Sequence, residues 1–189
     1  MIQINNELRD RAYKCACEHG FHDEEHHDSH WLALIMSEVG EAINADRKGK
    51  HAKSEGFIRW QTTLRNPSND RFYIADFDYF IKDTVEDELA DIVIRILDFA
   101  GLRDYDCSKY FETLCDITFV LPEKDQLSFF CYTLFTMLAN TQDDIEDVLR
   151  YSLFFISFYC KKKDIDLYTY IVWKMKYNEL RPMLNGKKY

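Results

Sequence analysis

The sequence has few of the residues that interrupt helices. Only 6 glycines and 3 prolines occur among 189 residues, and long segments with apolar residues at helical spacing lie between them. The sequence therefore predicts an all-α fold. Hydrophobic residues make up 47% of the chain and aromatic residues 15%, so a single globular domain over residues 1–189 can bury a substantial core.

The sequence also has no signals for secretion or for crossing a membrane. Its six cysteines include no C-x-x-C pair, which argues against a disulfide framework and a zinc ribbon and indicates reduced thiols in a cytoplasmic protein. The N-terminus contains acidic residues and no apolar core of a signal peptide. The most apolar runs, 127–139 and 151–160, are shorter than the ~20 residues of a membrane span. We expect them to form core or subunit-interface helices.

Several catalytic signatures are missing as well. The chain has no G-x-x-x-x-G-K-S/T loop, no G-x-G-x-x-G and no G-x-S-x-G. A net charge of −9 argues against nucleic-acid binding. That charge is uneven: residues 161–189 hold eight Lys/Arg and three acids, a balance of +5 that leaves −14 for residues 1–160. A basic end on an acidic chain predicts a local anion site.

The segment 84–101 is predicted to be a core-facing helix. Thr84 and Asp87 form a capping-box-like start, and Gly101 is expected to end the helix. Apolar residues at helical spacing form one stripe along it, at positions 85, 89, 92, 93, 96, 97 and 100.

A second informative helix is predicted from Asp28 or Ser29 to Lys48, with Gly49 as its stop. From residue 31 to 36 it is apolar almost all round, which indicates burial on several sides. Its expected buried stripe consists of Leu32, Met36, Val39 and Ile43, while Trp31, Leu34, Ala42 and Ala45 share a face with Glu38 and Glu41. These two carboxylates are therefore expected to point into a partly enclosed space, where they need a partner.

The remaining helices are expected on both sides of these two. A first helix should be capped by Asn5 or Asn6 and end at Gly20. The segment 50–70 breaks the helical pattern with charges, Gly56 and Pro67, and a short helix is expected near 57–64. Further helices are predicted at 71–82, 108–119, 123–140, 142–162 and 166–181, the last capped by Asp166.

Two acidic pairs suggest a metal site. Glu38 and Glu41 form an E-x-x-E pair, and Glu88 and Asp91 form an E-x-x-D pair; each pair leaves its helix in nearly one direction. Either pair alone is usually a solvated face, and Arg95 could neutralise Asp91. If the helices pack together, however, carboxylates about 5 Å apart repel by roughly 3 kcal/mol. Hard oxygen ligands without clustered thiolates predict Mg²⁺, with Mn²⁺ as an alternative.

The last helix offers cations for a phosphate group. Lys174, Asn178 and Arg181 lie on one face, with Lys176 nearby. An ordinary basic helix end, favoured by the macrodipole, explains the same pattern about as well. Together with a carboxylate-bound Mg²⁺, such residues could hold a polyphosphate for attack by an activated water.

These motifs resemble those of the MazG-like nucleotide pyrophosphohydrolases, which belong to the all-α NTP pyrophosphatase superfamily. The resemblance rests on SEVGEA (37–42), EDELADIVIRILDFAG (86–101) and KMKYNELRPMLNGKKY (174–189), and covers roughly 20–48, 80–103 and 166–189. It implies a four-helix-bundle core with additional helices, and a homodimer or homotetramer. It also implies Mg²⁺-dependent cleavage of nucleoside triphosphates to monophosphate and pyrophosphate.

The resemblance also implies roles for individual residues. Glu38, Glu41, Glu88 and Asp91 would be the catalytic metal ligands, and the phosphates would contact Lys174 or Lys176, Asn178 and Arg181. Forty-six residues separate Glu41 from Glu88, more than is usual in the family, so compared with the family 50–70 is expected to be an inserted loop that could act as a lid over the site. The segment 105–160 has no recognised motif. Trp31 is a candidate neighbour of the nucleobase, although a tryptophan at such a position is more often core.

Two other functions fit parts of the sequence. Histidines at 19, 22, 26, 27 and 30, with the dipeptide His27-Asp28, could belong to an HD-type phosphohydrolase or a transition-metal site. No second histidine cluster follows, so a polar link before a helix is the favoured interpretation. A non-enzymatic helical interaction module would keep the apolar stripes but would have no use for four convergent acids.

Overall fold

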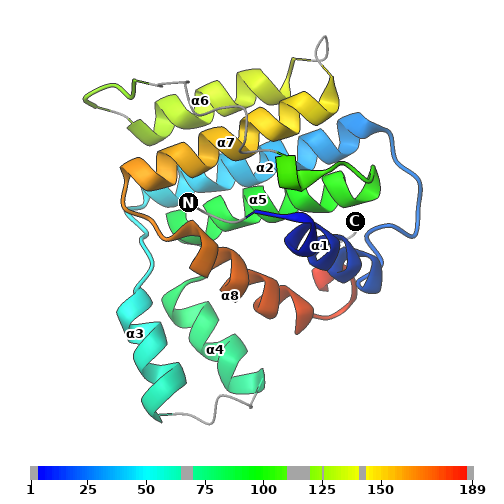
Figure 1. Cartoon of the computed structure of the whole chain (residues 1–189). Helices are drawn as coiled ribbons and strands as arrows, with labels where there is room; N and C mark the ends of the chain where they lie inside the picture. The colour runs from blue at the N-terminus through cyan, green and yellow to red at the C-terminus, as the bar shows by residue number, and fades with distance from the viewer. Residues whose placement is uncertain (1–3, 65–69, 110–119, 125, 141–143, 187–189) are drawn as a thin grey trace.

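The computed structural model describes residues 4–64, 70–109, 120–124, 126–140 and 144–186. Within these ranges the chain is all-α, with eight α-helices and no strand, as the scarcity of glycine and proline predicts. Helix α5 (Val85–Leu102) lies at the centre and packs against α1, α2, α7 and α8 (Figure 1). The others are α1 (Asn6–Glu18), α2 (Asp28–Arg47), α3 (Ser54–Arg59), α4 (Asp70–Phe80), α6 (Gln126–Leu138), α7 (Ile145–Lys162) and α8 (Leu167–Glu179).

The start of α5 is the predicted cap, with one difference. Thr84 is the N-cap and its Oγ1 accepts a hydrogen bond from the Asp87 N–H at 3.3 Å. The Asp87 carboxylate accepts in turn from the N–H of Asp83, one residue before the cap, at 3.0 Å. The first bond satisfies one of the free N–H groups that every helix start carries, and the second ties the residue before the cap to the first turn.

The predicted stop of α5 is off by one residue for a packing reason. The helix continues through Gly101 to Leu102. A Cβ at Gly101 would lie 2.5 Å from Cβ of Tyr13 on α1, far inside van der Waals contact. Gly101 therefore allows α1 to approach α5 closely, and the helix ends only at Arg103, the C-cap.

Helix α2 lies over α5 and is covered on its other side by α6. Its N-cap is His27, whose Nδ1 accepts from the Ser29 N–H, and neither predicted residue has that role. Gly49 follows the helix end in the left-handed conformation (φ +63°), as expected of a stop signal. Leu32 and Val39 of the predicted stripe are buried, whereas Met36 and Ile43 are half-buried.

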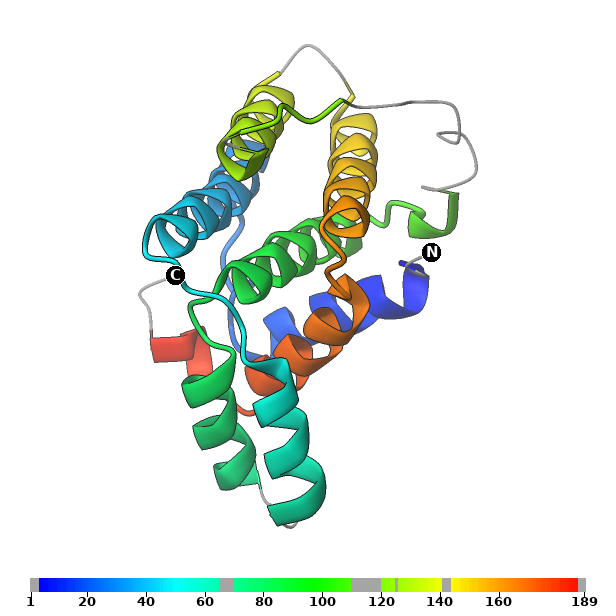
Figure 2. The same cartoon turned by 90° about the vertical axis from the view of Figure 1, so that its left-hand side faces the viewer.

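Segment 50–70 contains more helix than predicted. Helix α3 begins at Ser54 and is followed by a π-helical segment, Trp60–Leu64, so the expected short helix starts three residues early. Together with α4 it forms a helical hairpin that extends away from the bundle beside α8 (Figures 1 and 2). Phe57 fixes the hairpin, because its ring packs against Tyr73, Phe77 and Trp173.

The other predictions can be compared for the described ranges. The caps Asn5 and Asp166 are confirmed, and Gly20 follows α1 in the left-handed conformation. Helices α6 and α7 begin about three residues later than expected. Most of the helix predicted at 108–119 lies outside the described residues, which show a 3₁₀ turn at Cys107–Lys109. No helix in the described part of the chain combines the length and apolar character needed to cross a bilayer.

Candidate metal centre

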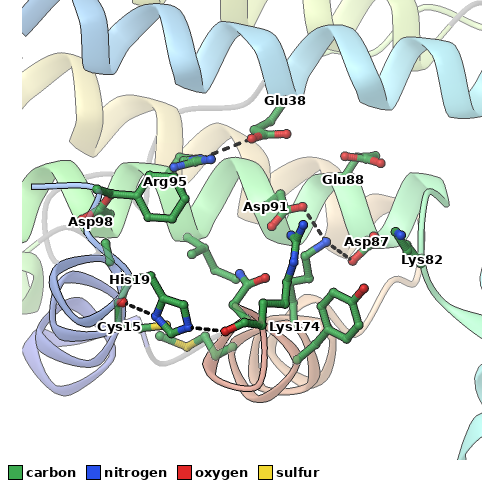
Figure 3. Close-up of a pocket in the computed structure, with 18 of the residues that line it drawn as sticks. Cys15, His19, Glu38, Lys82, Asp87, Glu88, Asp91, Arg95, Asp98 and Lys174 are labelled. Atoms are coloured by element: carbon green, nitrogen blue, oxygen red, sulfur yellow. Dashed lines mark hydrogen bonds and ion pairs between the residues drawn. The ribbon is translucent and has the colours of Figure 1, made fainter. Parts of the chain in front are cut away.

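Three carboxylates from two helices meet beneath α2. Glu38 on α2 and Glu88 and Asp91 on α5 each present one oxygen, and these oxygens all lie within 4.8 Å of one another. Their geometry follows from the close packing of α2 on α5 and from the three-residue spacing of the α5 pair, which puts both side chains on one face (Figure 3). Glu38 and Glu88 are buried and Asp91 is half-buried. One small divalent cation could contact all three side chains, which we call the acidic triad.

The fourth predicted ligand, Glu41, lies at the edge of this group. Its side chain is exposed and it lines the same cavity, but it does not belong to the acidic triad. Its charge nevertheless contributes to raising the pKa of Glu88. The structure thus brings together three of the four predicted carboxylates and places the fourth at the rim.

The acidic triad opens into a cavity of about 360 Å³ between α1, α2, α5 and α8. Asn178 and Arg181 line it, as does Lys174, whereas Lys176 does not. The Lys176 ammonium lies instead over the ring of Tyr73, 4.2 Å from its centroid. The Asn178 Oδ1 atom is buried and has no hydrogen-bond partner within the described residues. Because a buried amide oxygen normally accepts a hydrogen bond, this atom is available to a ligand or a water in the cavity.

Trp31, the candidate neighbour of a nucleobase, lies elsewhere. It is buried among aromatic rings, with its centroid 4.6 Å from His22 and 6.4 Å from Phe99, and it does not line the cavity. The α1 end of the cavity is formed by other residues that the sequence did not single out, among them Cys15, Ala16 and Phe21. Nothing in their local sequence marks them, because only the packing of α1 against α5 and α8 brings them there.

Lys174 is held by two carboxylates. Its Nζ lies 2.8 Å from Asp87 Oδ1 and 2.6 Å from Asp91 Oδ2, and the side chain is only 6% exposed. Burial alone would lower the pKa of Lys174, but the charges of Asp91 and Asp87 outweigh it, so the pKa is raised. Lys174 is therefore charged and fixes the orientation of one member of the acidic triad.

Asp87 is a functional candidate that the sequence did not reveal. It is almost completely buried, pairs with Lys174 and accepts from the Asp83 N–H. Burial raises its pKa to about 7, against the opposing charge of Lys174 and with the help of Asp91. The sequence assigns Asp87 only to the helix cap, which is a sufficient local reason for an acidic residue at this position. The missed signal was its four-residue spacing from Asp91, which puts both carboxylates within reach of one lysine.

Glu88 has a strongly perturbed carboxyl group. Burial is the main cause that raises its pKa to about 9, followed by the charges of Asp91 and Asp87. Without a cation, Glu88 is therefore protonated at neutral pH, because ionising it would add an uncompensated charge to an acidic site.

Arg95 has a different partner from the one its spacing suggested. Its Nε donates to Glu38 Oε1 at 3.2 Å, across the interface between α5 and α2, whereas the sequence offered Asp91 as the partner. The guanidinium also lies 5.3 Å from the ring centroid of Phe21. Asp91 is instead bound by Lys174, so each of these two carboxylates has its own basic partner.

The histidine-rich segment forms no comparable site. His22 pairs with Asp98 at 2.7 Å, His27 caps α2, and the rings of His26 and His30 stack at 4.1 Å. Throughout the described residues, the acidic triad is the one group in which three potential metal-binding side chains converge. The ligand geometry of a histidine-based site is therefore not present in the described part of the chain.

The chain was compared with protein-family models, curated proteins and solved structures, and no match was found in any of the three.

Proposed function

We propose that this chain is a Mg²⁺-dependent nucleotide pyrophosphohydrolase that cleaves (d)NTP to (d)NMP and pyrophosphate. The observation that carries the proposal is the acidic triad beside a cavity that also contains basic groups. Three carboxylates within 4.8 Å of one another repel one another when all are ionised, so the ionised triad favours a cation, and oxygen ligands of this kind suit Mg²⁺ or Mn²⁺.

The residues divide into two groups by their place in the cavity. Glu38, Glu88 and Asp91 would hold the cation, and we include Glu41 as a fourth ligand because an exposed side chain at the rim can rotate toward it. Asn178, whose Oδ1 has no partner among the described residues, lies on α8 and lines the cavity, as does Arg181 just after that helix. Arginine suits this position, because its planar fork matches phosphate oxygens.

In the proposed reaction, a water loses a proton to solvent and its oxygen adds to the α-phosphorus, the bond to the bridging oxygen breaks, and pyrophosphate leaves. The resemblance to MazG-like enzymes selects the α–β bond. Bound Mg²⁺ would supply charge stabilisation and a lower pKa for the attacking water. Lys174 keeps Asp91 oriented and does not depend on substrate for its own position, since two carboxylates already hold it.

Location and assembly are part of the same proposal. All cysteines among the described residues are free, which fits a reducing compartment such as the cytoplasm. A homodimer or homotetramer follows from the resemblance, and light scattering of the purified protein would measure it.

The deciding experiment measures pyrophosphate release from a panel of NTPs and dNTPs, with Mg²⁺ and with EDTA. We expect magnesium-dependent monophosphate and pyrophosphate, lost in Glu38→Gln because that change removes a charged ligand. Asp46→Asn is the matched control, since Asp46 is an exposed acid on the same helix and lies outside the acidic triad. Absence of turnover on every nucleotide would refute the proposed activity. Absence of Mg²⁺ binding as well would refute the metal site and favour an interaction module.

A further inference from the structure

The ion pair between Arg95 and Glu38 lies at the edge of the acidic triad. Arg95 follows Asp91 by one turn of α5 and lines the cavity, and its Nε lies 3.2 Å from Glu38 Oε1. The guanidinium thus binds a carboxylate that belongs to the acidic triad. A divalent cation at the acidic triad would bind the same carboxylate and repel the nearby guanidinium, so the two cations compete for Glu38.

Arg95 and Lys174 differ in how firmly they are held. Lys174 is 6% exposed and bound by two carboxylates, one of which, Asp87, lies outside the acidic triad. Arg95 is 17% exposed, and Glu38 is its one ion-pair partner among the described residues. Displacing Lys174 would leave Asp87 without its cation, whereas the guanidinium of Arg95 can move into the cavity. Arg95 is therefore the cation that can leave.

We propose that Arg95 is a displaceable counter-ion of Glu38: the incoming divalent cation releases its guanidinium, which then binds the phosphate chain of the nucleotide. The second step depends on the proposed function. Only one of the five guanidinium donors takes part in the bond to Glu38, and Phe21 lies against the group. Because Arg95 reaches a ligand of the cation, phosphate oxygens on that cation would lie at a similar distance.

Displacement can be measured without nucleotide, by titrating Mn²⁺ into wild type and Arg95→Met. We expect Mn²⁺ to bind about tenfold more tightly to the variant, which corresponds to losing a competitor worth about 1.4 kcal/mol. Lys82→Met is the matched control. Lys82 also lines the cavity, but its ion-pair partner is Asp78, outside the acidic triad. That variant should tighten Mn²⁺ binding clearly less, since it removes charge without freeing a ligand.

The phosphate contact is measured with an α,β-methylene NTP in the presence of saturating Mn²⁺. This analogue can bind, but it cannot be cleaved between the α and β phosphates. We expect Arg95→Met to weaken binding of this analogue about tenfold. Arg95→Lys retains the charge without the planar fork. Its affinities for Mn²⁺ and for the analogue should therefore lie between those of wild type and Arg95→Met. This second variant keeps the test informative if methionine prevents folding.

Opposite changes in the two affinities support the proposal, because a purely structural defect would weaken both. Unchanged or weaker Mn²⁺ binding in Arg95→Met, or tightening no greater than in Lys82→Met, would overturn the displacement. Unchanged affinity for the analogue would overturn the phosphate contact. Failure of the proposed function is distinguishable: wild type would then bind Mn²⁺ but neither bind the analogue nor hydrolyse any nucleotide, and the Mn²⁺ comparison would still decide the first step.

Discussion

Cation binding to the acidic triad should release a proton from Glu88. The pKa of this buried carboxyl is raised to about 9, so at pH 7 only about one molecule in a hundred has it ionised. A divalent cation requires the carboxylate and therefore has to displace the proton. The cost at pH 7 is roughly 3 kcal/mol, since each pKa unit corresponds to about 1.4 kcal/mol.

The sign and range of the effect follow from the same value. Below about pH 9 the apparent affinity for Mg²⁺ or Mn²⁺ should rise about tenfold for each pH unit, and above it the affinity should level off. Calorimetric titrations at pH 7, in buffers of equal pH but different ionisation enthalpy, count the released protons. We expect close to one proton per bound cation from Glu88.

Two variants separate Glu88 from its neighbours. Glu88→Gln has no proton to release and lacks a ligand, so the pH-dependent term and most of the cation affinity should disappear together. Glu41→Gln alters the exposed carboxylate at the rim and should retain proton release. An affinity that is equal at pH 6.5 and 8.5, with no proton released, would show that Glu88 is already ionised and that the electrostatic reasoning is wrong.

Three further predictions concern stability. Without a bound cation, the protein should lose stability as pH rises from about 4.5 to about 9, because folded Glu88 retains a proton that the unfolded chain releases. The loss should reach up to about 1.4 kcal/mol per pH unit. In urea unfolding across this range, the stability of Glu88→Gln should depend less on pH than that of wild type. Lys174→Met should lower the free energy of unfolding by about 3–5 kcal/mol, because it leaves Asp87 and Asp91 without their cation. Lys176→Met on the same helix should lower it by less than about 1 kcal/mol. Equal urea midpoints for the two variants would contradict this prediction. Gly101→Ala should destabilise the protein by about 1–3 kcal/mol, because the new Cβ would lie 2.5 Å from Tyr13. Gly40→Ala should stabilise the protein by up to about 1 kcal/mol, because nothing lies within 4 Å of a Cβ at that position. Thermal unfolding of the two variants tests this contrast.

Local signals in the sequence were sufficient for much of the helical framework. The caps Asn5, Thr84 and Asp166 and the left-handed glycines at 20 and 49 depend on interactions within a few residues, and they are found where predicted. Gly101 was different. It has the appearance of a stop signal, but its role is set by Tyr13, which lies far away in the sequence.

The candidate site shows the same division between local and long-range information. The three-residue spacing within each acidic pair predicts which carboxylates share a direction, and three of the four converge. Their basic partners could not be read from spacing. Arg95 was within one turn of Asp91 yet pairs with Glu38, because α2 crosses α5 at that level. Lys174 reaches Asp91 from a helix 83 positions later in the chain.

The charge state of the site without a divalent cation explains how a chain with so acidic a cavity can fold. Asp91 and Asp87 share Lys174, Glu38 has Arg95, and Glu88 retains a proton. No member of the acidic triad therefore carries an uncompensated buried charge, which would cost several kcal/mol. Two of these arrangements also oppose a divalent cation, which has to displace the proton of Glu88 and the guanidinium of Arg95 before it contacts all three ligands. The stability of the protein without a cation and its affinity for the cation are thus inversely linked through Glu38 and Glu88.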